Sequence, residues 1–492
     1  MFPSIPSLRF DNRTGLDALH FDTIDQNGVA FHVVVAKTAY RFDGCDEHGH
    51  ARLVSLEDPA PLYTDDMCYQ DDTEQSVRCE SDLAPYKPHC DVIVVGSAHA
   101  PGGKPVRRFG VRLHLQLPDQ PAPLPERPFP LNPMQPLSFD TEQAWKEELA
   151  LAERTMVPGR VLIDKVLTVT GERELQRRLA PVRLAQLMVA VVTLGLVQLN
   201  RWRLTTSAPS TSVPLRYEYA QGGQCVIPAD GKGAKRVPKR HRLTRAQQEQ
   251  YSYLLVPPAA LDASQVNPIG CGFAPRWYLR ASGLKRLPAP RIEYAHAPFT
   301  ARRFWQSAVG RPVLVPAGFG YVGRAWLPRR SLVGTIETKS HWEPDEVPAL
   351  PKDFDFAYWN GAPQDQQCEH LAGGERLTLT NLCAPGAPFA RADSADNTVL
   401  SFALPQQSPF LLATNAVGAV AAMPLAIDTV LIDAEAGQVE LSWRLCIVAD
   451  GEFADARLLQ AANEEQLGRL AAWNTPPDRA AAPTSPHAAT TV

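Results

Sequence analysis

Residues 80–106 read ESDLAPYKPHCDVIVVGSAHAPGGKPV, and this stretch decides the fold class. Pro85 and Pro88 stiffen a loop, because a proline ring fixes φ at about −65°. Residues 91–95 are almost all β-branched, which is typical of a buried strand. The Pro-Gly-Gly sequence at 101–103 then predicts a turn that returns the chain antiparallel. The stretch is therefore a loop, a strand and a turn, and none of these parts is a catalytic device.

Alternating apolar residues predict further antiparallel strands elsewhere in the chain. Residues 19–42 form a predicted hairpin, with Asn27 and Gly28 as a two-residue turn. Apolar residues alternate without error from 109 to 117, which indicates a strand with one buried face. A second hairpin is predicted at 430–447. We therefore expect a mainly β protein with antiparallel, sandwich-like sheets, long structured loops and a few inserted helices.

The composition along the chain predicts several segments. Eight prolines in 118–136 indicate an extended connector. A helix capped by Ser138 is predicted to follow and to end near Arg154. Strand character resumes at 161–170, before an apolar helix around 184–199. The expected segments are an N-terminal β region (1–117), a proline-rich linker with a helical insertion (118–158), a second β-rich and loop-rich region (159–450), a C-terminal helical segment (451–473, with a helix at 464–473) and a disordered tail (474–492).

Charge and cysteine content limit the possible functions. The formal net charge of −4 argues against a general nucleic-acid binder, because affinity for phosphates depends on many Lys and Arg contacts. The nine cysteines are odd in number and form no Cys-x-x-Cys pair, which disfavours a disulfide framework or a zinc knuckle. The longest apolar run is too short to span a membrane. No secretory signal is visible at the N-terminus, so a cytoplasmic location without membrane contact is expected.

Three features of the sequence suggest functional sites but have simpler interpretations. Gly102-Gly103-Lys104 suggests a phosphate loop, but the required first glycine and the magnesium-binding hydroxyl are missing, so a β-turn is favoured. The histidines carry no matched carboxylate or cysteine motif, and neither a metal nor a cofactor is expected. Seven cations crowd one loop, which is interpreted as exposed and flexible, with an anionic contact as the alternative. The histidines are His20, His32, His48, His50, His89, His99 and His114, and the cations are Lys232, Lys235, Arg236, Lys239, Arg240, Arg242 and Arg245.

Several strings occur in the order found in one bacterial family. They are PLRYE at 214–218 with Gly222-Gly223, NPIGCGF at 267–273, PAGFG at 316–320 with Arg324, Trp326, Pro328 and Arg329, LPKDFD at 350–355, WNGAPQDQQ at 359–367, GGE at 373–375 and Asn381-Leu382. Together with 80–106, these strings resemble the domain-of-unknown-function family DUF2169. The insertion at 117–160, the apolar helix and the basic loop depart from the shared pattern. They are either candidate cargo-specific elements or tolerated surface insertions.

The resemblance implies a cytoplasmic adaptor or chaperone that is not an enzyme. Members of the family accompany type VI secretion effectors, so the implied partners are a secreted toxin and the spike protein, with no nucleic acid expected. Two alternatives stay open. One is a hydrolase-like enzyme using Asp82, Lys87 and His89 or His99, and the other is a β-sandwich module that binds carbohydrate or peptide.

The resemblance assigns structural roles and no catalytic ones, because Gly, Pro and Asn dominate the motifs and fix loops in place. We expect Asp82 and Lys87 to pair and so brace their loop. Exposed aromatic residues are candidate protein contacts, namely Tyr86, Phe319, Trp326, Tyr358 and Trp359. The predicted structural motif comprises Glu80, Ser81, Asp82, Leu83, Pro85, Lys87, Pro88, Pro101, Gly102, Gly103, Pro105, Asn360, Pro363, Gln366, Gly373, Gly374 and Glu375.

Overall fold

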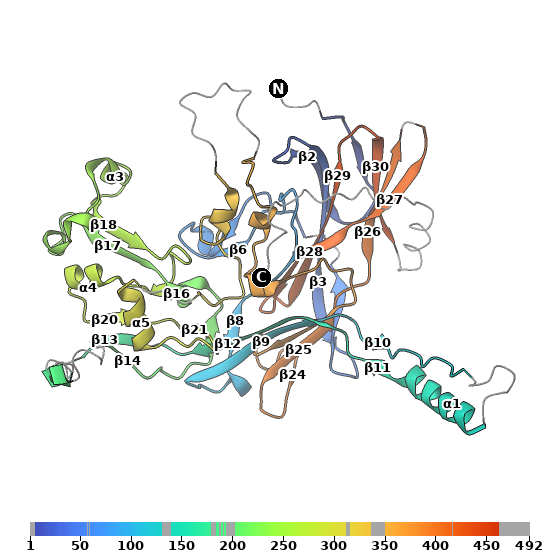
Figure 1. Ribbon diagram of the computed structural model, residues 1–492, viewed down its shortest axis with the longest axis horizontal. Coiled ribbons are helices and arrows are strands. Elements are labelled where there is room, and N and C mark those ends of the chain that lie inside the picture. Colours follow the sequence, from blue (N-terminus) through green and yellow to red (C-terminus); the bar gives the residue numbers. More distant parts are fainter. Residues whose placement is uncertain are drawn as a thin grey trace.

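The computed structural model describes residues 5–56, 58, 60–129, 139–178, 184–185, 188–189, 191–192, 202–310, 315–335, 350–415 and 417–461. Four predictions lie wholly or mostly outside these residues: the Ser138 cap, the helix at 184–199, the helix at 464–473 and the tail from 474 onward. Within the described part, the protein consists mainly of antiparallel sheets joined by long loops (Figure 1). The predicted fold class is confirmed.

The largest sheet has seven strands in the order β2-β3-β29-β28-β7-β22, with β4 also paired to β3. All neighbours are antiparallel except β28 and β7, which are parallel. The predicted hairpins at 19–42 and 430–447 are confirmed as β2 with β3 and β28 with β29. The strands are β2 (Asp17–Ile24), β3 (Ala30–Cys45), β4 (Ala51–Ser55), β7 (Cys90–Val95), β22 (Gln367–Cys368), β28 (Ala426–Asp433) and β29 (Gln438–Val448).

The turn between β2 and β3 differs from the predicted two-residue turn. The Asp25 amide donates to the Val29 carbonyl at 2.9 Å, so three residues form the loop. Gly28 has φ 81°, the left-handed conformation that ends such a loop. This one-residue difference sets the register and places Asp22 opposite His32.

The second sheet has six antiparallel strands in the order β21-β12-β9-β23-β25-β24. Strand β9 alternates buried and exposed residues, as the sequence predicts. A third sheet, β1-β30-β26-β27, includes β30, which corrects the helical expectation for the start of 451–473: backbone pairing with β26 overrides local propensity there. The strands are β9 (Arg108–Gln116), β12 (Val161–Thr170), β21 (Ile292–Tyr294), β23 (Arg376–Thr380), β24 (Arg391–Ala392), β25 (Thr398–Ala403), β1 (Arg9–Asn12), β26 (Ser408–Asn415), β27 (Val420–Pro424) and β30 (Phe453–Ala461).

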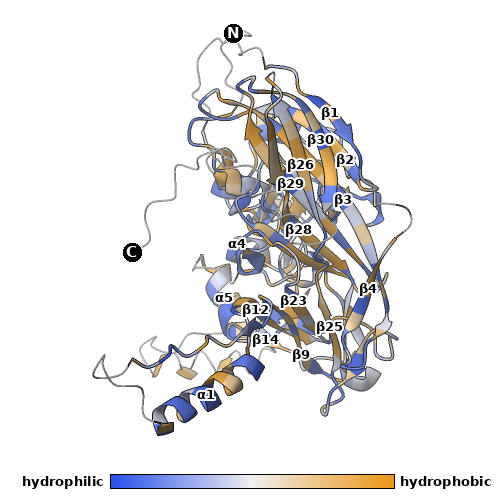
Figure 2. Cartoon of the chain, turned by 90° about the vertical axis from the view of Figure 1, so that its right-hand side faces the viewer, coloured by the Kyte–Doolittle hydropathy of each residue, from blue (hydrophilic) through white to orange (hydrophobic). Residues whose placement is uncertain are grey.

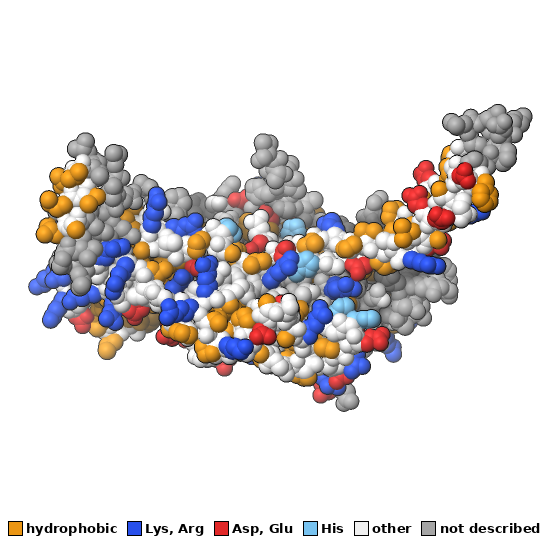
Figure 3. Space-filling view, turned by 90° about the horizontal axis from the view of Figure 1, so that it is seen from below, with side chains coloured by type: hydrophobic (Ala, Val, Ile, Leu, Met, Phe, Trp, Pro, Cys, Tyr) orange, Lys and Arg blue, Asp and Glu red, His pale blue; other side chains and the backbone are white. Residues whose placement is uncertain are grey.

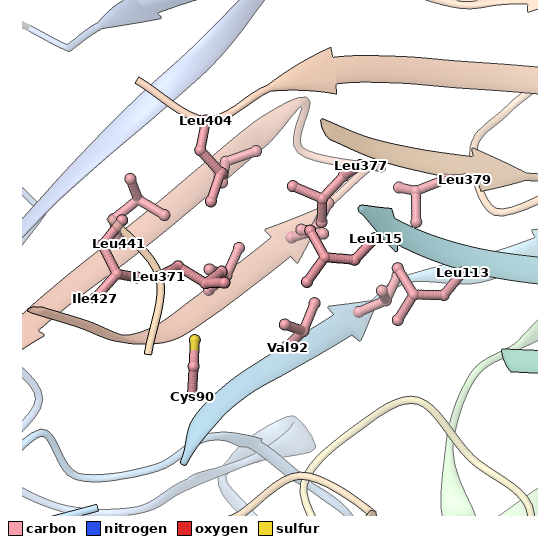
Figure 4. Packing of buried hydrophobic residues seen from close by; sticks show 14 of the residues in the cluster. Cys90, Val92, Leu113, Leu115, Leu371, Leu377, Leu379, Leu404, Ile427 and Leu441 are labelled. Atoms are coloured by element: carbon pink, nitrogen blue, oxygen red, sulfur yellow. The ribbon is translucent and has the colours of Figure 1, made fainter. Parts of the chain in front are cut away.

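The main hydrophobic core lies between these sheets. Figure 4 shows Val92 of β7 facing Leu113 and Leu115 of β9, with Leu377 of β23 beside them. All four side chains are fully buried. Apolar residues concentrate on the strands of the body, as Figure 2 shows by hydropathy. Strands from before residue 117 and after residue 160 interleave in both large sheets, so the two halves of the chain share one core.

An arm extends from the hairpin formed by β9 and β12 (Figure 1). The Leu117 amide donates to the Arg160 carbonyl at 2.9 Å and closes the base of the arm. The arm contains β10 (Gln120–Pro121), β11 (Met156–Val157) and α1 (Phe139–Arg154), and α1 ends where the sequence predicts. The insertion therefore interrupts the sheet at a turn and leaves the pairing of β9 with β12 intact.

A smaller subdomain lies at the opposite end of the molecule, where Figure 1 shows α3, α4 and β17. Its own core centres on Trp202, Phe299 and Phe304. Its elements are β13 (Glu174–Arg177), β14 (Trp202–Leu204), β16 (Gln221–Gly222), β17 (Gln224–Pro228), β18 (Pro258–Ala263), β19 (Cys271–Gly272), β20 (Arg286–Pro288), α3 (Arg245–Glu249), α4 (Arg276–Ser282) and α5 (Ala301–Ala308).

Further pairs of short strands lie outside the large sheets. All nine cysteines are free thiols. No helix among the described residues is both long and apolar enough to cross a membrane. The short strands are β5 (Met67–Cys68), β6 (Val77–Cys79), β8 (Ser97–His99) and β15 (Ser212–Pro214).

Candidate functional site

The predicted motif residues of 80–88, together with Asn360, gather on the outer face of the seven-stranded sheet, away from the main core. Alternation along β29 turns Leu441 and Trp443 to the core and Ser442 and Arg444 to the outer face. Loops at 60–89, 315–335 and 350–367, called the motif loops below, cover this face and bury its charges. The buried polar groups between sheet and loops, called the polar layer below, are Lys37, Glu80, Asp82, Lys87, Asp91, Arg329, Asn360, Asp428, Thr429, Ser442 and Arg444.

Asp82 does not pair with Lys87, which corrects the expected brace. Its Oδ2 lies 3.0 Å from Lys37 Nζ on β3, and its Oδ1 accepts a hydrogen bond from Ser442 Oγ at 2.9 Å. The Tyr63 amide also donates to Oδ2 at 2.9 Å. Lys37 lies 3.0 Å from Glu440 as well. Asp82 therefore fastens its loop to the two central strands of the sheet.

Lys87 pairs with Asp91, the second residue of β7. Its Nζ lies 3.0 Å from Asp91 Oδ2 and donates to Thr429 Oγ1 at 2.8 Å. Burial alone would lower the pKa of Lys87, but the carboxylates of Asp91 and Asp428 more than offset burial, so this pKa lies above its ordinary value. Lys87 is thus a charged structural link and has no free lone pair for base catalysis.

Asp91 is also the anchor of the 359–367 string. Its carboxylate accepts hydrogen bonds from Asn360 Nδ2 at 3.0 Å and from the amides of Gly361 and Ala362 at 2.9 and 3.1 Å. Asn360 Nδ2 also donates to the His89 carbonyl at 2.7 Å. Because Asp91 is fully buried, these hydrogen bonds replace the ones that water would make with an exposed carboxylate.

Arg444 and Asp428 form a second buried pair. Arg444 Nε lies 2.5 Å from Asp428 Oδ2, and Nη1 donates to the Ala84 carbonyl in the motif loop. Burial raises the pKa of Asp428, but Arg444 and Lys87 outweigh burial, so the pKa lies below its ordinary value. Arg444 of β29 therefore also holds the 80–88 loop, and Asp428 of β28 holds Arg444 in place.

Glu80 and Arg329 link two motif loops to each other. Arg329 donates through two nitrogens to the Glu80 carboxylate, and further bonds at 3.0 and 2.9 Å reach the Tyr358 carbonyl. Arg324 lies 3.0 Å from Asp66 beside this pair. Both members of the central pair are buried, and the Glu80 carboxylate contributes to raising the pKa of Arg329 against the effect of burial.

Gln366 connects the two large sheets. Its Nε2 donates to the carbonyls of Val92 and Phe319 at 2.6 and 2.9 Å, and its Oε1 accepts from Lys165 Nζ at 2.7 Å. Lys165 lies on β12, and its Nζ is also 2.7 Å from Asp365 Oδ1. Burial lowers the pKa of Lys165 to about 8, although Asp365 opposes that shift. No local pattern points to Lys165, because its partners lie at least 200 residues away in the chain.

The remaining motif residues shape turns. Glu375 accepts from the amides of Ala372 and Gly373 at 2.9 Å each. Residues 101–103 form a short 3-10 turn, which supports the predicted turn over a phosphate loop. The other positions are Ser81 (Oγ donates to the Thr64 carbonyl, 2.9 Å), Pro85 (buried), Leu83, Pro88, Pro363 and Gly374 (half-buried) and Pro105 (exposed).

Two of the five predicted contact aromatics are not exposed. Phe319 is fully buried in the main core. Trp326 is 9 % exposed, and its ring packs edge-on against Tyr217 at 5.4 Å. Tyr86, Tyr358 and Trp359 are half-buried. Tyr358 and Trp359 are adjacent, with ring centroids 5.3 Å apart. Only these three remain available as surface contacts.

The hydrolase residues do not come together as a catalytic set. Asp82 and Lys87 have separate buried partners, as described above. His89 is exposed, whereas His99 lies on β8, opposite Ser212 of β15. Burial lowers the pKa of His99. No hydrogen bond among the described residues joins these four side chains into a relay.

The predicted histidines also separate, except for one group. His20 and His32 meet Asp22 on the hairpin of β2 and β3, and this group of three is close enough to hold a metal ion. Burial lowers the pKa of His20, and Asp22 opposes that shift. The rings of His48 and His50 are 6.5 Å apart on a different turn. Asp22 was missed, because the predicted two-residue turn would put His32 on the other face of the hairpin.

The basic loop contains two short 3-10 turns and packs on the smaller subdomain. Val237 is buried against Trp277, and the His241 ring stacks on Trp277 at 5.2 Å. Arg242 Nε donates to the Val237 carbonyl at 3.0 Å. All seven cations are nevertheless exposed. Figure 3 shows Lys and Arg side chains gathered at this end of the molecule, opposite the arm.

Comparison with known families agrees with the sequence resemblance. Residues 27–120 and 143–444 match the family described as uncharacterized protein conserved in bacteria (DUF2169). The chain belongs to this family. The DUF2169 match omits only 121–142 of the insertion. It spans residues 143–160, the basic loop and the predicted apolar helix, which we expected to lie outside the shared pattern. No curated protein and no solved structure matches the chain.

Proposed function

We propose that this DUF2169 protein is a cytoplasmic adaptor that binds a type VI secretion effector and helps load it onto the spike protein. The observation that carries the proposal is the arm. Its helix α1 has no buried residue, and it extends from a body whose motif residues are already used in internal contacts. Exposed apolar side chains on a separate element, such as Phe139 and Leu151, suit a protein interaction site.

One side of α1 packs on the described part of the connector, and the side chains on its other side are exposed. Trp145 Nε1 donates to the Pro125 carbonyl at 3.2 Å, and Leu149 shares this half-buried side. On the exposed side, Phe139 is 82 % and Leu151 is 68 % exposed. An isolated helix of this length is only marginally stable in water, so contact with a partner would stabilise it.

The charge of α1 selects the chemistry of that partner. The helix carries five carboxylates, from Asp140, Glu142, Glu147, Glu148 and Glu153, against the two cations Lys146 and Arg154. Figure 3 shows acidic and apolar side chains together on the arm. We therefore expect the arm to bind an effector segment that combines apolar and basic residues.

The polar layer supports a scaffold function. Its charges are neutralised in pairs within the protein, so they hold the motif loops and leave Tyr358 and Trp359 at the surface. Neither the hydrolase nor the carbohydrate-binding alternative is favoured by a specific contact among the described residues.

Co-expression with the toxin encoded beside the gene tests the proposal. The toxin should co-purify with the wild-type protein and should depend on the protein for delivery to the spike. Co-purification should fall at least ~10-fold for F139D/L151D, since two exposed anchors are lost. The matched control is L255D, which changes a fully exposed leucine at the other end of the molecule. A toxin that is delivered without the protein would contradict the adaptor function.

A further inference from the structure

The edge of the seven-stranded sheet carries a group of ligand-type side chains that the proposed function does not use. His20 and Asp22 alternate on β2 and share a face, and His32 lies directly opposite Asp22 on β3. Strand β2 is the outermost strand of the sheet, so one side of the group is open. The side chains are 14 % exposed for His20, 36 % for Asp22 and 3 % for His32.

The three ligand atoms converge on one point. His20 Nε2 lies 3.2 Å from His32 Nδ1 and 3.2 Å from Asp22 Oδ1, and His32 Nδ1 lies 2.7 Å from the same oxygen. Zinc binds imidazole nitrogen at about 2.0–2.1 Å and carboxylate oxygen at about 2.0–2.2 Å. Two ligands of one ion can therefore be at most ~4.2 Å apart. All three separations meet this limit without movement of the backbone.

Hydrogen bonding alone satisfies this arrangement poorly. A ring nitrogen of a neutral imidazole offers either one proton or one lone pair. If both rings donate to Asp22, the two N–H groups face each other across 3.2 Å. If one ring nitrogen instead accepts a hydrogen bond from the other ring, its lone pair faces the Asp22 carboxylate, and the two repel each other. A cation at the centre accepts a lone pair from all three atoms and removes the conflict.

We propose that His20, Asp22 and His32 form a binding site for one divalent transition-metal ion of the zinc class. Two imidazoles and one carboxylate are ligands that zinc accepts, and three protein ligands leave the fourth tetrahedral position open to water on the exposed side. The ion joins the edge strand β2 to β3. It also lies beside β1, because the Phe10 ring is 6.0 Å from the His20 ring. The site therefore fastens the edge of the sheet.

Zinc titration of the full-length, tag-free chain tests the site. After removal of metal with a chelator, isothermal titration should give one zinc ion per chain at this site. The affinity should fall at least ~10-fold for D22N and further for H20A/H32A, since these changes remove ligands directly. The matched control is H48A/H50A, which removes two histidines from a turn that is not part of a converging group of three ligand atoms among the described residues. This variant should bind zinc as the wild type does.

A second measurement uses only the wild-type chain, so it does not require any variant to fold. Histidine side-chain NMR of the wild-type chain should show two imidazoles that shift together and reach their end point at one equivalent of zinc. A wild type without one-to-one binding, or without imidazole shifts, would overturn the proposal. Unchanged zinc binding by folded H20A/H32A would also overturn it, and would place the ion on the free cysteines instead.

Discussion

Lys37 Nζ lies 3.0 Å from Oδ2 of Asp82, although 45 residues separate the two in sequence. Both side chains are buried, at 2 % and 7 % exposure. This pair, and not a contact between Asp82 and Lys87, holds the 80–88 loop on the sheet. The charged residues of this loop are therefore components of the fold.

Removing Lys37 should destabilise the protein strongly. K37M leaves the carboxylate of Asp82 buried without its cation, and breaking a buried pair in this way costs about 3–5 kcal/mol. Urea unfolding measures the loss. The control is K104M, because Lys104 pairs with Asp396 at 3.3 Å on the surface, where both side chains are mostly exposed. A loss for K37M no larger than that for K104M would contradict the structural role.

Arg329 should not be replaceable by lysine. R329K keeps the charge but loses the planar fork that reaches Glu80 and the Tyr358 carbonyl together. Because a hydrogen bond to a charged group contributes ~1.5–3 kcal/mol, we expect the free energy of unfolding to fall by at least ~2 kcal/mol. R330K, at an exposed neighbour, is the control. Equal stability of both variants would show that the Glu80–Arg329 pair does not need two donors.

The pH dependence of stability should reveal Lys165. Its pKa is lowered from 10.5 to about 8 in the folded protein by burial. Between these two values the unfolded chain binds more protons than the folded chain, so the free energy of unfolding should rise with pH across this window. The rise attributable to Lys165 is at most ~3 kcal/mol. Chemical unfolding of the wild type and of K165M at several pH values measures this rise. If the free energy of unfolding changes with pH in the same way in both proteins, the rise does not come from Lys165.

Gly373 tests the turn that Glu375 caps. It has φ 104°, and an added Cβ would lie 2.4 Å from the Pro405 carbonyl oxygen. Gly386 has φ 82° with nothing within 4 Å of its Cβ position. G373A and G386A therefore share the conformational strain, and G373A alone adds a clash. We expect G373A to be less stable by at least ~1 kcal/mol in thermal unfolding. Equal losses of stability in the two variants would mean that the loop around Pro405 moves away from the added methyl group.

Local patterns were sufficient to predict the longest strands of the two large sheets and the end of the inserted helix. The alternation at 109–117 and 439–447 depends only on neighbouring residues, and so does the end of α1 at Arg154. The β30 strand could not be predicted in this way, because its partners β26 and β1 are set by the tertiary fold. Local sequence therefore specifies the elements better than it specifies their pairing.

The candidate sites were harder to predict than the fold, because their partners are distant in sequence. The sequence places Asp82 and Lys87 together, yet strands β3, β7, β28 and β29 supply the actual partners. Charged residues inside strands, such as Lys37 and Arg444, were the available signal. The His20 group depends on a single residue in the turn: Asp22 faces His32 only with the three-residue loop.

The most direct test of the adaptor function is the equilibrium affinity between this protein and its neighbouring toxin, measured by isothermal titration with the purified full-length proteins. We predict stoichiometric binding by the wild type and by L255D, with at least ~10-fold weaker binding by F139D/L151D at unchanged thermal stability. No binding by the wild type would contradict the adaptor function. Equal binding by all three proteins would contradict the use of the arm.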